Sequence, residues 1–485
     1  MFGYGAILGG GIGRDLRFGV MKLYDTRARA AVDVAPHDGS TLTLYACGPT
    51  VYRFAHVGNV RTFLLTDLIA RAAALASYKI KIVQNITDVG HMIDDTGLGG
   101  ADEGQGDTED KLLAQSRTEN KSALDIARFY EAAFHTDLAR LNIRPANSYP
   151  RASETIGLMI TLISTLIDRG HAYIGGDGSV FFDARSCADY GAISGNRLDA
   201  LKPGHRFDGE TDPNKRFHAD WALWKFAPST RTQLVWETPW GVGFPGWHTE
   251  CSAMSIDQLG DHIDIHTGGI DLRFPHHEDE RAQSNAFAEH DVVKHWVHAE
   301  HLLFEGRKMS KSTGNVVLVQ DVIDRGFDPL ALRLSFLGSR YRTQIDLTWD
   351  SIAAADAQLK KWRQRTSNVA GGVVDDSAKQ AFTAAFLDDL DTPRALQVLR
   401  DVEKSSMSDA DKAAFILWAD ESLGLDLDRP ADVVDIPLEV QQLSDKRAAA
   451  REAKNWAASD ELRDQIAALG WEVRDTAGGQ ELSAK

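Results

Sequence analysis

From Leu42 onward the chain shows a strand, a turn, a long helix and a second strand, and this order is the feature that most constrains its fold. An apolar strand leads to Gly48 and Pro49, a helix rich in alanine and leucine follows, and the segment KIKIVQNITDV forms the second strand. A β-α-β unit of this kind predicts a doubly wound parallel sheet. Ligand phosphates in such sheets lie beyond the carboxyl end of a strand, at the start of a helix, and the stretch around His56 occupies that position.

Later segments extend this pattern into a multidomain chain. Short strands and turns between Tyr173 and Lys225 indicate an inserted module, and strand signals return in HIDIHTGGIDL and HWVHAEHLLF. Alanine-rich helical segments follow, separated by linkers at residues 369–376 and 424–437. We therefore predict an α/β protein: a Rossmann-like, doubly wound parallel-sheet catalytic domain with an inserted module, then an α-helical bundle and a small C-terminal domain.

Composition narrows the class of protein further. The 485 residues carry 53 Lys and Arg against 70 Asp and Glu, and the net charge of −17 argues against a general nucleic-acid coat or a binder of anionic membranes. A local basic site for nucleic acid is still compatible with this charge. No apolar run approaches the ~18 residues that span a bilayer, so we expect a soluble cytoplasmic protein with no membrane partner. Three cysteines cannot build a disulfide framework, and their sparing use favours a reducing compartment.

The segment KMSKSTGN, residues 308–315, is the first chemical motif. It places the ammonium groups of Lys308 and Lys311 on one loop among small hydroxyl residues and a glycine, where both can contact one polyanion. Taken alone, the segment would also fit a solvated charged turn.

The second motif starts the first long helix. His56 and Asn59 share one face of its first turn and can donate hydrogen bonds to phosphate oxygens, while Gly58 lets a ligand approach the backbone. Together the two motifs predict ATP with Mg²⁺, activated for attack at the α-phosphorus. His56 and the helix start would stabilise charge on the α-phosphate, and Lys308 and Lys311 the departing pyrophosphate. The chain has no G-x-x-x-x-G-K-[ST] motif, which disfavours P-loop γ-phosphoryl transfer.

Two of the three thiols flank this predicted ATP site. Cys47 ends the first strand, Cys251 lies in GWHTECSAMS, and His276 and Glu280 follow in PHHEDE, four residues apart and hence on one helical face. Two Cys, one His and one Glu form a plausible zinc set, although their wide separation excludes a zinc finger. The nearby residues His248 and His277 are rival ligands, and Glu280 could contact the metal directly or through water. The third thiol, Cys187, has no such neighbours in the sequence, and we expect it to be inert.

These residues together resemble the cysteinyl-tRNA synthetase family, within the class I aminoacyl-tRNA synthetases. The resemblance runs from Met21 to the C-terminus through the motifs YACGPTVYRFAHVGN, NITDV, DWALWK, GFPGWHTECSAMS, HTGGIDLRFPHHEDE, KMSKSTGN, YRTQIDLTW, DDLDTPRAL and KNWAASDELRD. It departs from the family at Asn59, where a second His is common. It departs again at residues 91–110, where a glycine-rich acidic loop replaces a short acidic run and a lysine.

The resemblance implies a function and a set of site residues. It implies that Cys47, Cys251, His276 and Glu280 hold Zn²⁺, with the substrate thiolate as an added ligand. Zinc binds sulfur far better than a hydroxyl, so the site can reject serine without an editing domain. The residues implied for the cysteine substrate are Gly48, Thr87, Trp247 and Asp271: Trp247 would wall the pocket, and Thr87 and Asp271 would hold the amino group.

The C-terminal segment concentrates cations in an acidic chain. Lys446, Arg447, Arg451 and Lys454 lie within about two helical turns beside Trp456, which fits either a solvated amphipathic helix with a core tryptophan or a surface that stacks on RNA bases. The resemblance favours an anticodon site. The residues it implies are Arg451, Trp456, Asp460 and Asp475.

The resulting domain expectation has seven segments. They are a flexible N-terminal extension (1–20), the first half of the catalytic domain (21–140), an inserted connective module (141–235), the second half (236–305), the KMSKS loop and stem-contact region (306–368), the helical bundle (369–430) and a small anticodon-binding domain (438–485).

We therefore expect an ATP-dependent cysteine–tRNA ligase whose partners are L-cysteine, ATP and cysteine tRNA, acting as a monomer. One alternative is the related ligase of the mycothiol pathway, which joins cysteine to an aminosugar and would not need the two modules after Gly371. Another is a non-catalytic RNA-binding paralogue, against which the intact Lys308 and Lys311 pair and the zinc set argue.

Overall fold

A computed structural model describes residues 20–90, 110–201, 212–309, 314–367, 369–430, 437–476 and 479–484. Residues up to Asp428 form one compact unit, and residues from Arg429 form a second. Residues 1–19 of the predicted extension (1–20), residues 91–109 of the glycine-rich loop (91–110) and Lys311 lie outside the described residues.

A four-stranded sheet in the order β11-β10-β3-β4 is the centre of the first unit. It consists of β3 (Thr41–Ala46), β4 (Lys79–Gln84), β10 (Ile263–Gly269) and β11 (Val293–Ala299), and every pairing is parallel. Helix α1 (Val57–Leu75) connects β3 to β4. The predicted β-α-β unit is therefore confirmed.

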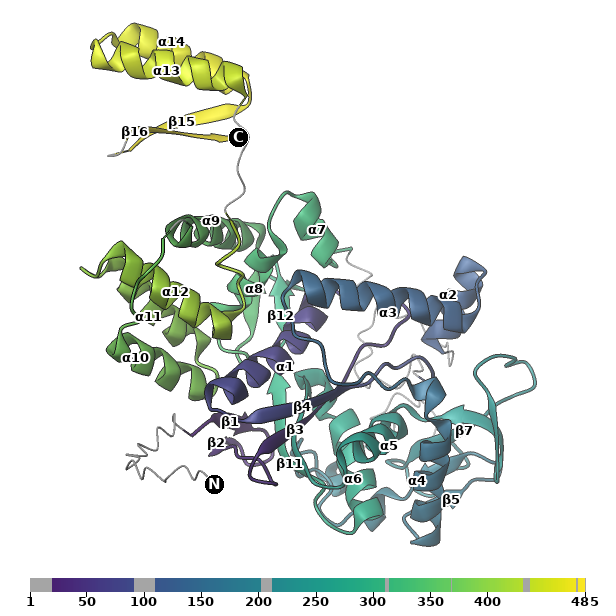
Figure 1. The fold of residues 1–485 in the computed structure, drawn as a ribbon. Coiled ribbons are helices and arrows are strands. Elements are labelled where there is room, and N and C mark those ends of the chain that lie inside the picture. Colours follow the sequence, from purple (N-terminus) through teal and green to yellow (C-terminus); the bar gives the residue numbers. More distant parts are fainter. Residues whose placement is uncertain are drawn as a thin grey trace, which may run out of the picture. The chain divides into compact units, whose positions relative to one another are not determined.

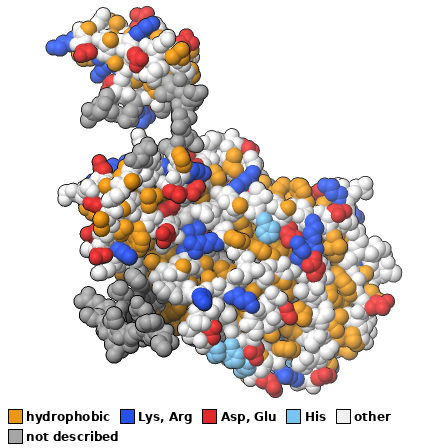
Figure 2. Space-filling model, viewed as in Figure 1, with side chains coloured by type: hydrophobic (Ala, Val, Ile, Leu, Met, Phe, Trp, Pro, Cys, Tyr) orange, Lys and Arg blue, Asp and Glu red, His pale blue; other side chains and the backbone are white. Residues whose placement is uncertain are grey.

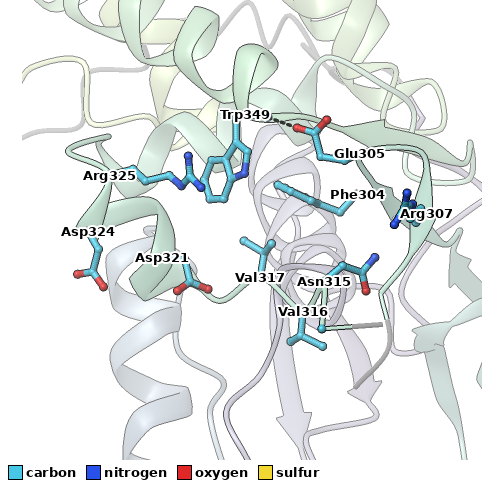
Figure 3. Close-up of a pocket in the computed structure, with 11 residues that line it drawn as sticks. Phe304, Glu305, Arg307, Asn315, Val316, Val317, Asp321, Asp324, Arg325 and Trp349 are labelled. Carbon is cyan, nitrogen blue, oxygen red and sulfur yellow. Dashed lines mark hydrogen bonds between the residues drawn. The ribbon is translucent and has the colours of Figure 1, made fainter. Parts of the chain in front are cut away.

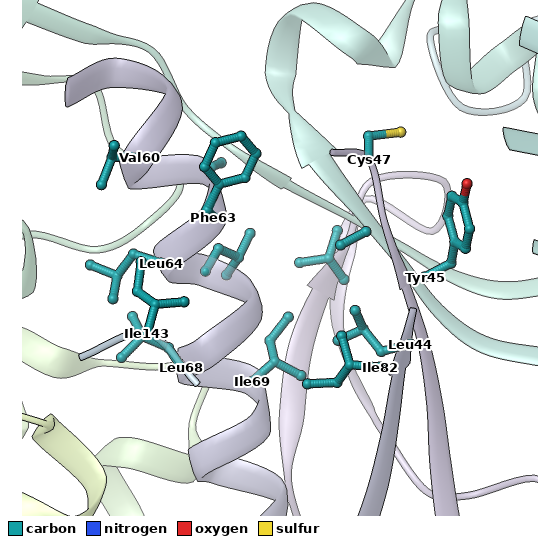
Figure 4. Close-up of a cluster of buried hydrophobic side chains, with 14 of the residues drawn as sticks. Leu44, Tyr45, Cys47, Val60, Phe63, Leu64, Leu68, Ile69, Ile82 and Ile143 are labelled. Atoms are coloured by element: carbon teal, nitrogen blue, oxygen red, sulfur yellow. The ribbon is translucent and has the colours of Figure 1, made fainter. Parts of the chain in front are cut away.

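Helices cover both faces of this sheet (Figure 1). α1 packs on one face, and α5 (Trp247–Leu259) and α6 (His276–Ala288) lie on the other. Figure 4 shows Leu44 and Ile82 pointing toward Ile69 and Leu68 of α1, whereas Tyr45 points away from that helix. Successive strand residues point to opposite faces, so one short apolar strand serves two buried layers. The predicted Rossmann-like, doubly wound architecture is confirmed.

The segment between β4 and β10 carries three helices and an antiparallel sheet. The helices are α2 (Lys111–Glu119), α3 (Ala123–Arg140) and α4 (Ile156–Asp168). The sheet has the order β5-β6-β7-β9-β8, with strands Ala172–Ile174, Val180–Phe182, Trp221–Phe226, Gly241–Pro245 and Trp236–Thr238. Its strand β9 lies beyond residue 235, where we expected the inserted module to end, and leads directly into α5.

Smaller elements complete the first unit. A hairpin of β1 (Lys22–Asp25) and β2 (Ala30–Asp33) precedes the main sheet, and β12 (Leu302–Phe304), β13 (Arg307–Lys308) and β14 (Ile345–Leu347) form a sheet after it. Short 3₁₀ helices span Ala152–Glu154, Ala184–Ser186, Leu198–Ala200 and Ile270–Arg273.

The segment predicted as the stem-contact region contains the helices α7 (Val319–Asp324), α8 (Pro329–Leu337) and α9 (Trp349–Thr366). The segment predicted as the bundle contains α10 (Asp376–Leu387), α11 (Thr392–Lys404) and α12 (Asp409–Leu423). A buried charge network joins α8 to α1: Asp67 Oδ2 accepts hydrogen bonds from Arg71 Nε at 2.8 Å and Arg333 Nη2 at 2.6 Å. Arg333 also donates to the carbonyl of Leu423 in α12, so one guanidinium ties the sheet domain to the bundle.

The second unit is a pair of helices with a β-hairpin. α13 (Leu438–Glu452) and α14 (Trp456–Ala468) pack on β15 (Trp471–Thr476), which pairs antiparallel with β16 (Gly479–Ala484). Val440, Ile466, Trp471 and Val473 form its core.

One face of the molecule shows how charged side chains are distributed over the described residues (Figure 2). On the face shown in Figure 2, acidic and basic side chains are interspersed. Among the described residues, no helix combines the length and the apolar character needed to cross a bilayer.

Candidate active site

The four predicted zinc-set residues come together at the carboxyl end of the main sheet. Cys47 follows β3 directly, Cys251 lies in the second turn of α5, and His276 and Glu280 occupy the first two turns of α6. One sulfur, nitrogen or oxygen atom from each lies within 4.8 Å of the others, and all four residues are buried. His276 Nε2 is 2.8 Å from Glu280 Oε1.

A second, overlapping set shares two of these residues. Cys47 and Glu280 also lie within 4.8 Å of His266 and His277. His277 Nε2 is 3.2 Å from Cys47 Sγ, and His266 Nε2 is 2.9 Å from Glu280 Oε2. Sequence reasoning named His277 as a rival ligand but missed His266. The strand pairing would have indicated it: β10 is the neighbour of β3, and His266 is paired in register with Tyr45, two residues before Cys47.

The other rival, His248, lies behind His276. The Nδ1 atoms of the two rings are 2.7 Å apart, and Trp247 stacks on the His276 ring at 4.1 Å between centroids. His248 Nε2 is 3.4 Å from Asp279 Oδ2. His248 therefore contacts the nitrogen of His276 that faces away from Glu280.

The two thiols differ in their acidity. Burial opposes ionisation of Cys251, but hydrogen bonds from Cys47 and His276 lower the pKa of its thiol to about 6. Burial and the adjacent Cys251 raise the pKa of Cys47 well above its usual value. Burial disfavours the charged form of His276, yet Glu280 and Cys251 raise the pKa of its imidazole to about 10. Of the two thiols, Cys251 is therefore the one whose surroundings favour the thiolate, the form of cysteine that binds metals.

The third cysteine lies apart from this cluster. The Cys187 thiol donates to Asp189 Oδ1 at 3.4 Å, and burial together with that carboxylate raises the pKa of the thiol to about 12. A thiol that stays protonated is a poor nucleophile, which agrees with the expectation that Cys187 is inert.

A cavity of about 280 Å³ opens beside the cluster and contains most of the predicted ligand-binding residues. Its lining includes Cys47, Gly48, His56, Asn59, Thr87, Trp247, Cys251, Asp271 and His276. Gly48 has no room for a side chain, because a Cβ there would lie 1.6 Å from the carbonyl oxygen of Asn85. The Gly48 N–H donates to Asn85 Oδ1 at 2.8 Å, and Asn85 Nδ2 donates to Thr87 Oγ1 at 3.0 Å.

The start of α1 forms one wall of the cavity through a reciprocal cap. His56 is the N-cap residue, and its Nδ1 accepts hydrogen bonds from the backbone N–H groups of Gly58 at 3.1 Å and Asn59 at 3.2 Å. The Asn59 side-chain oxygen accepts a hydrogen bond from the backbone N–H of His56 at 3.1 Å. Burial and the nearby Arg53 lower the pKa of the His56 imidazole to about 4. Because Nδ1 is an acceptor in this neutral ring, the proton is on Nε2.

The lysine motif adjoins this helix start. The N–H of Val57 donates to the carbonyl of Val317 at 2.9 Å, and a Cβ on Gly58 would lie 3.0 Å from the Met309 methyl carbon. Lys308 ends β13 and is exposed. The two motifs, 250 residues apart in the chain, are therefore neighbours in space.

A second cavity of about 560 Å³ lies behind the lysine motif (Figure 3). Two contacts hold its walls together: the backbone N–H of Trp349 donates to Glu305 Oε1 at 3.0 Å, and the Arg325 guanidinium carbon lies 3.8 Å from the Trp349 ring centre. Asn315 Nδ2 donates to the carbonyl of Lys308 at 3.1 Å across the base of the loop.

The second unit brings three of the four predicted anticodon residues together. Arg451 Nη1 is 3.2 Å from Asp475 Oδ2, its guanidinium carbon is 5.5 Å from the Trp456 ring centre, and the Trp456 side chain is exposed. Asp460 instead pairs with Arg463 at 2.9 Å. Arg447, which the sequence suggested as part of a cationic surface, is buried and holds Asp475 through two hydrogen bonds at 2.9 and 3.0 Å.

Comparison with known proteins assigns both units to one family. Residues 33–98 and 104–357 match the family described as tRNA synthetases class I (C) catalytic domain, and residues 434–482 match the cysteinyl-tRNA ligase anticodon binding domain. The cysteine–tRNA ligase of Opitutus terrae is 38% identical over 472 residues, covering 95% of this chain and 98% of its own length. Cysteine–tRNA ligase 1 of Burkholderia lata is 40% identical over 469 residues, covering 95% and 96%.

A solved structure supports the fold. The LeuRS of Agrobacterium radiobacter, in a ternary complex with tRNA and LeuAMS, aligns with a TM-score of 0.57 at 10% identity over 81% of this chain and 84% of its own. Together with the two matched regions and the identity over nearly the whole length, this fold shows that the chain belongs to the cysteinyl-tRNA ligase family of class I aminoacyl-tRNA synthetases.

Proposed function

We propose that this chain activates L-cysteine with ATP to give cysteinyl-adenylate and pyrophosphate, and then transfers cysteine to the 3′ end of cysteine tRNA. The observation that supports this proposal most strongly is the buried sulfur, nitrogen and oxygen cluster against the 280 Å³ cavity, whose wall is also the start of α1. An amino-acid thiol and an ATP phosphate could therefore meet in one cavity.

The donor set suits Zn²⁺, which binds cysteine sulfur, histidine nitrogen and carboxylate oxygen in tetrahedral sites. Two overlapping quartets are available, and the cavity favours the first. Its members Cys47, Cys251 and His276 line the cavity, whereas His266 and His277 do not. We therefore assign the metal to Cys47, Cys251, His276 and Glu280. Bound there, zinc would prefer the substrate thiolate to the hydroxyl of serine.

The start of α1 suits the α-phosphate. The neutral His56 ring offers Nε2–H as a donor at neutral pH, since its Nδ1 is used by the helix cap. A fixed donor and the helix N-terminus would stabilise negative charge that develops on the α-phosphate during attack by the cysteine carboxylate. Lys308, and Lys311 by its place in the motif, would neutralise the departing pyrophosphate, which leaves with Mg²⁺.

Gly48, Thr87, Trp247 and Asp271 are proposed to hold the cysteine. All four line the cavity, and Trp247 stacks on the His276 ring, so it forms a wall next to the metal ligands. Thr87 and Asp271 present oxygen atoms suited to an ammonium group. An ammonium held there would leave the carboxylate free to face the α-phosphate.

The mouth of the cavity offers a surface for the tRNA 3′ end. Phe54 and Phe129 are 42% and 51% exposed, and their ring centres are 6.0 Å apart. Tyr130 packs edge-on against both rings, and Lys121 Nζ lies 5.6 Å from the Phe129 ring centre. Exposed aromatic rings with a nearby cation are the usual platform for single-stranded nucleic acid. In the second unit, Arg451, Trp456 and Asp475 form the corresponding candidate for anticodon bases.

Three measurements test the proposal. Cysteine-dependent exchange of pyrophosphate into ATP should occur without tRNA, and its absence in metal-replete protein would refute the adenylation reaction and favour a non-catalytic paralogue. Metal analysis should find about one zinc per chain, and Cys251→Ser should weaken its retention. Cys187→Ser is the matched control, since that thiol lies outside the cluster.

The acceptor is tested by offering tRNA and an aminosugar to the same enzyme preparation. Charging of cysteine tRNA is expected, whereas ligation to the aminosugar alone would support the mycothiol-type reaction. That the chain works as a cytoplasmic monomer stays a prediction, and light scattering during gel filtration would test the oligomeric state.

A further inference from the structure

A second cluster of metal-binding side chains lies at the opposite edge of the main sheet. Asp261 and His262 directly precede β10, and His290 lies in the turn between α6 and β11. Because β10 and β11 are adjacent and parallel, the residues that precede them meet at the amino edge of the sheet, away from the cavity at the carboxyl edge. Figure 2 shows histidine side chains gathered beside acidic ones at the lower edge of the first unit.

One carboxylate connects the two imidazoles. Asp261 Oδ1 is 2.9 Å from His262 Nδ1, and Asp261 Oδ2 is 3.2 Å from His290 Nε2. One ligand atom from each of the three residues lies within 4.8 Å of the others. The side chains of Asp261, His262 and His290 are 55%, 50% and 36% exposed, so an ion from solution can reach them and keep some of its water.

The hydrogen bonds of His290 fix which of its nitrogens faces the carboxylate. Its Nδ1 lies 3.2 Å from the backbone carbonyl of Asp291, an acceptor, so Nδ1 carries a proton. In the neutral ring, Nε2 would then present a lone pair to the Asp261 oxygen. Two acceptors at that distance repel unless a cation lies between them, and this cation is either a proton or a metal ion.

We propose that Asp261, His262 and His290 bind a divalent transition-metal ion, with water completing its coordination. Two imidazoles and one carboxylate suit Zn²⁺, Ni²⁺ or Cu²⁺ rather than Mg²⁺ or Ca²⁺, which prefer sets of oxygen ligands. His37, in the loop before β3, lies with its ring centre 4.6 Å from that of His262. The His37 ring contacts a ligand without belonging to the three-residue set, so it serves as an internal control.

The position of this ion gives it a structural effect. His262 directly precedes β10, and His290 follows the C-terminal end of α6. The metal would therefore cross-link the start of β10 to the end of α6. The same helix carries His276 and Glu280 at its other end. A bound ion therefore restrains α6 from the end opposite the catalytic cavity.

Calorimetric titration of the full-length, zinc-loaded protein with Ni²⁺ tests the proposal. We expect one Ni²⁺ per chain to bind at this cluster in the wild type. His262→Ala and His290→Ala should each weaken that binding at least tenfold, while His37→Ala should leave it unchanged. His135→Ala is the matched control, because His135 is a partly exposed histidine beside a single carboxylate, with Nε2 3.9 Å from Glu131.

The difference in Ni²⁺ affinity between the wild type and the variants decides the result, because Ni²⁺ that is bound by the thiol cluster would be the same in all of them. Thermal unfolding provides the second readout: saturating Ni²⁺ should raise the Tm of wild type and His37→Ala more than that of His290→Ala. Pyrophosphate exchange without added Ni²⁺ should be equal in all variants, which shows that they are folded. Equal Ni²⁺ affinity in wild type, His262→Ala and His290→Ala, or no binding to the wild type, would overturn the proposal.

Discussion

Replacing His56 with asparagine should separate two roles that one imidazole combines in the structure. Nδ1 caps α1 by accepting two backbone hydrogen bonds, at 3.1 and 3.2 Å, and Nε2–H is the donor proposed for the α-phosphate. Asparagine is among the best N-cap residues, so His56→Asn keeps an acceptor for the helix. Its shorter side chain, turned toward the helix N–H groups, leaves no donor where Nε2–H had been.

The two roles differ in free energy enough to be measured separately. Loss of an N-cap side chain costs about 0.5–2 kcal/mol of stability, whereas loss of one donor to developing charge costs about 10²–10³-fold in rate, or ~2.7–4 kcal/mol. We therefore expect His56→Ala to lose both stability and activity. His56→Asn should keep wild-type stability within a few tenths of a kcal/mol and lose only the rate.

The assay is cysteine-dependent pyrophosphate exchange at saturating substrates, with thermal unfolding of the same samples. The pKa of His56, lowered by burial and Arg53 to about 4, predicts that exchange shows no titration of this group between pH 6 and 8. The lowered value also means that the unfolded chain binds the proton more tightly. The contribution of the neutral His56 ring to the free energy of unfolding is therefore fully present above about pH 6.5, and it is lost as the pH falls toward 4.

Near-wild-type exchange in His56→Asn, with a clear loss in His56→Ala, would show that the imidazole acts only as a cap, and the proposed donor role would be refuted. A titration near pH 6.5 in the wild-type exchange profile that disappears in His56→Asn would contradict the neutral ring. Asn59→Asp is a control for the unfolding measurement alone, because it keeps the side-chain oxygen that accepts the backbone N–H of His56.

Four further substitutions test other parts of the structure. His266→Gln should weaken zinc binding about 10–100-fold in competition with a chelator, because it changes the group that holds Glu280 Oε2. Trp456→Ala should lower the efficiency of tRNA charging about tenfold without changing pyrophosphate exchange, since base stacking contributes ~1–3 kcal/mol. Equal loss of both activities would show that Trp456 is not part of an RNA-binding site. Phe129→Ala should likewise reduce charging more than exchange, as single-turnover transfer would show. Asp67→Ala should cost about 3–5 kcal/mol in urea unfolding, because it leaves two buried arginines without their carboxylate; a loss below ~1 kcal/mol would contradict the role of this network.

The local pattern of the sequence was sufficient for the β-α-β unit. Apolar residues predicted the strands β3 and β4, and the alanine-rich run between them predicted a helix. A helical connection of this kind predicts that the two strands pair in parallel, as they do. Placing Cys47 near the start of α1 needed only the rule that ligands bind at the carboxyl edge of such a sheet. That rule does not apply to Cys251, which lies in α5 after strand β9 of the antiparallel sheet. The structure adds the lateral order β11-β10-β3-β4, which no local pattern contains.

That lateral order explains what the sequence did not reveal. His266 lies near Cys47 because β10 lies beside β3, and no spacing rule relates these two strands across more than 200 residues. Arg447 was counted as a surface cation because it shares a helix with Arg451. Its burial depends on Asp475, 28 residues later, whose position is set by the strand β15. Charge patterning along a helix predicts exposure only where no later segment covers that face.

The three histidines outside the favoured zinc quartet have a common arrangement. Each contacts one member of the quartet: His248 Nδ1 lies 2.7 Å from His276 Nδ1, His266 Nε2 lies 2.9 Å from Glu280 Oε2, and His277 Nε2 lies 3.2 Å from Cys47 Sγ. Residues that hold metal ligands fix their orientation and tautomer, and so the geometry in which a metal is bound. The fourth member, Cys251, lines the cavity together with Cys47 and His276. At the proposed zinc site these contacts would orient Cys47, His276 and Glu280, and zinc held in this way would bind the thiolate of cysteine in preference to the hydroxyl of serine.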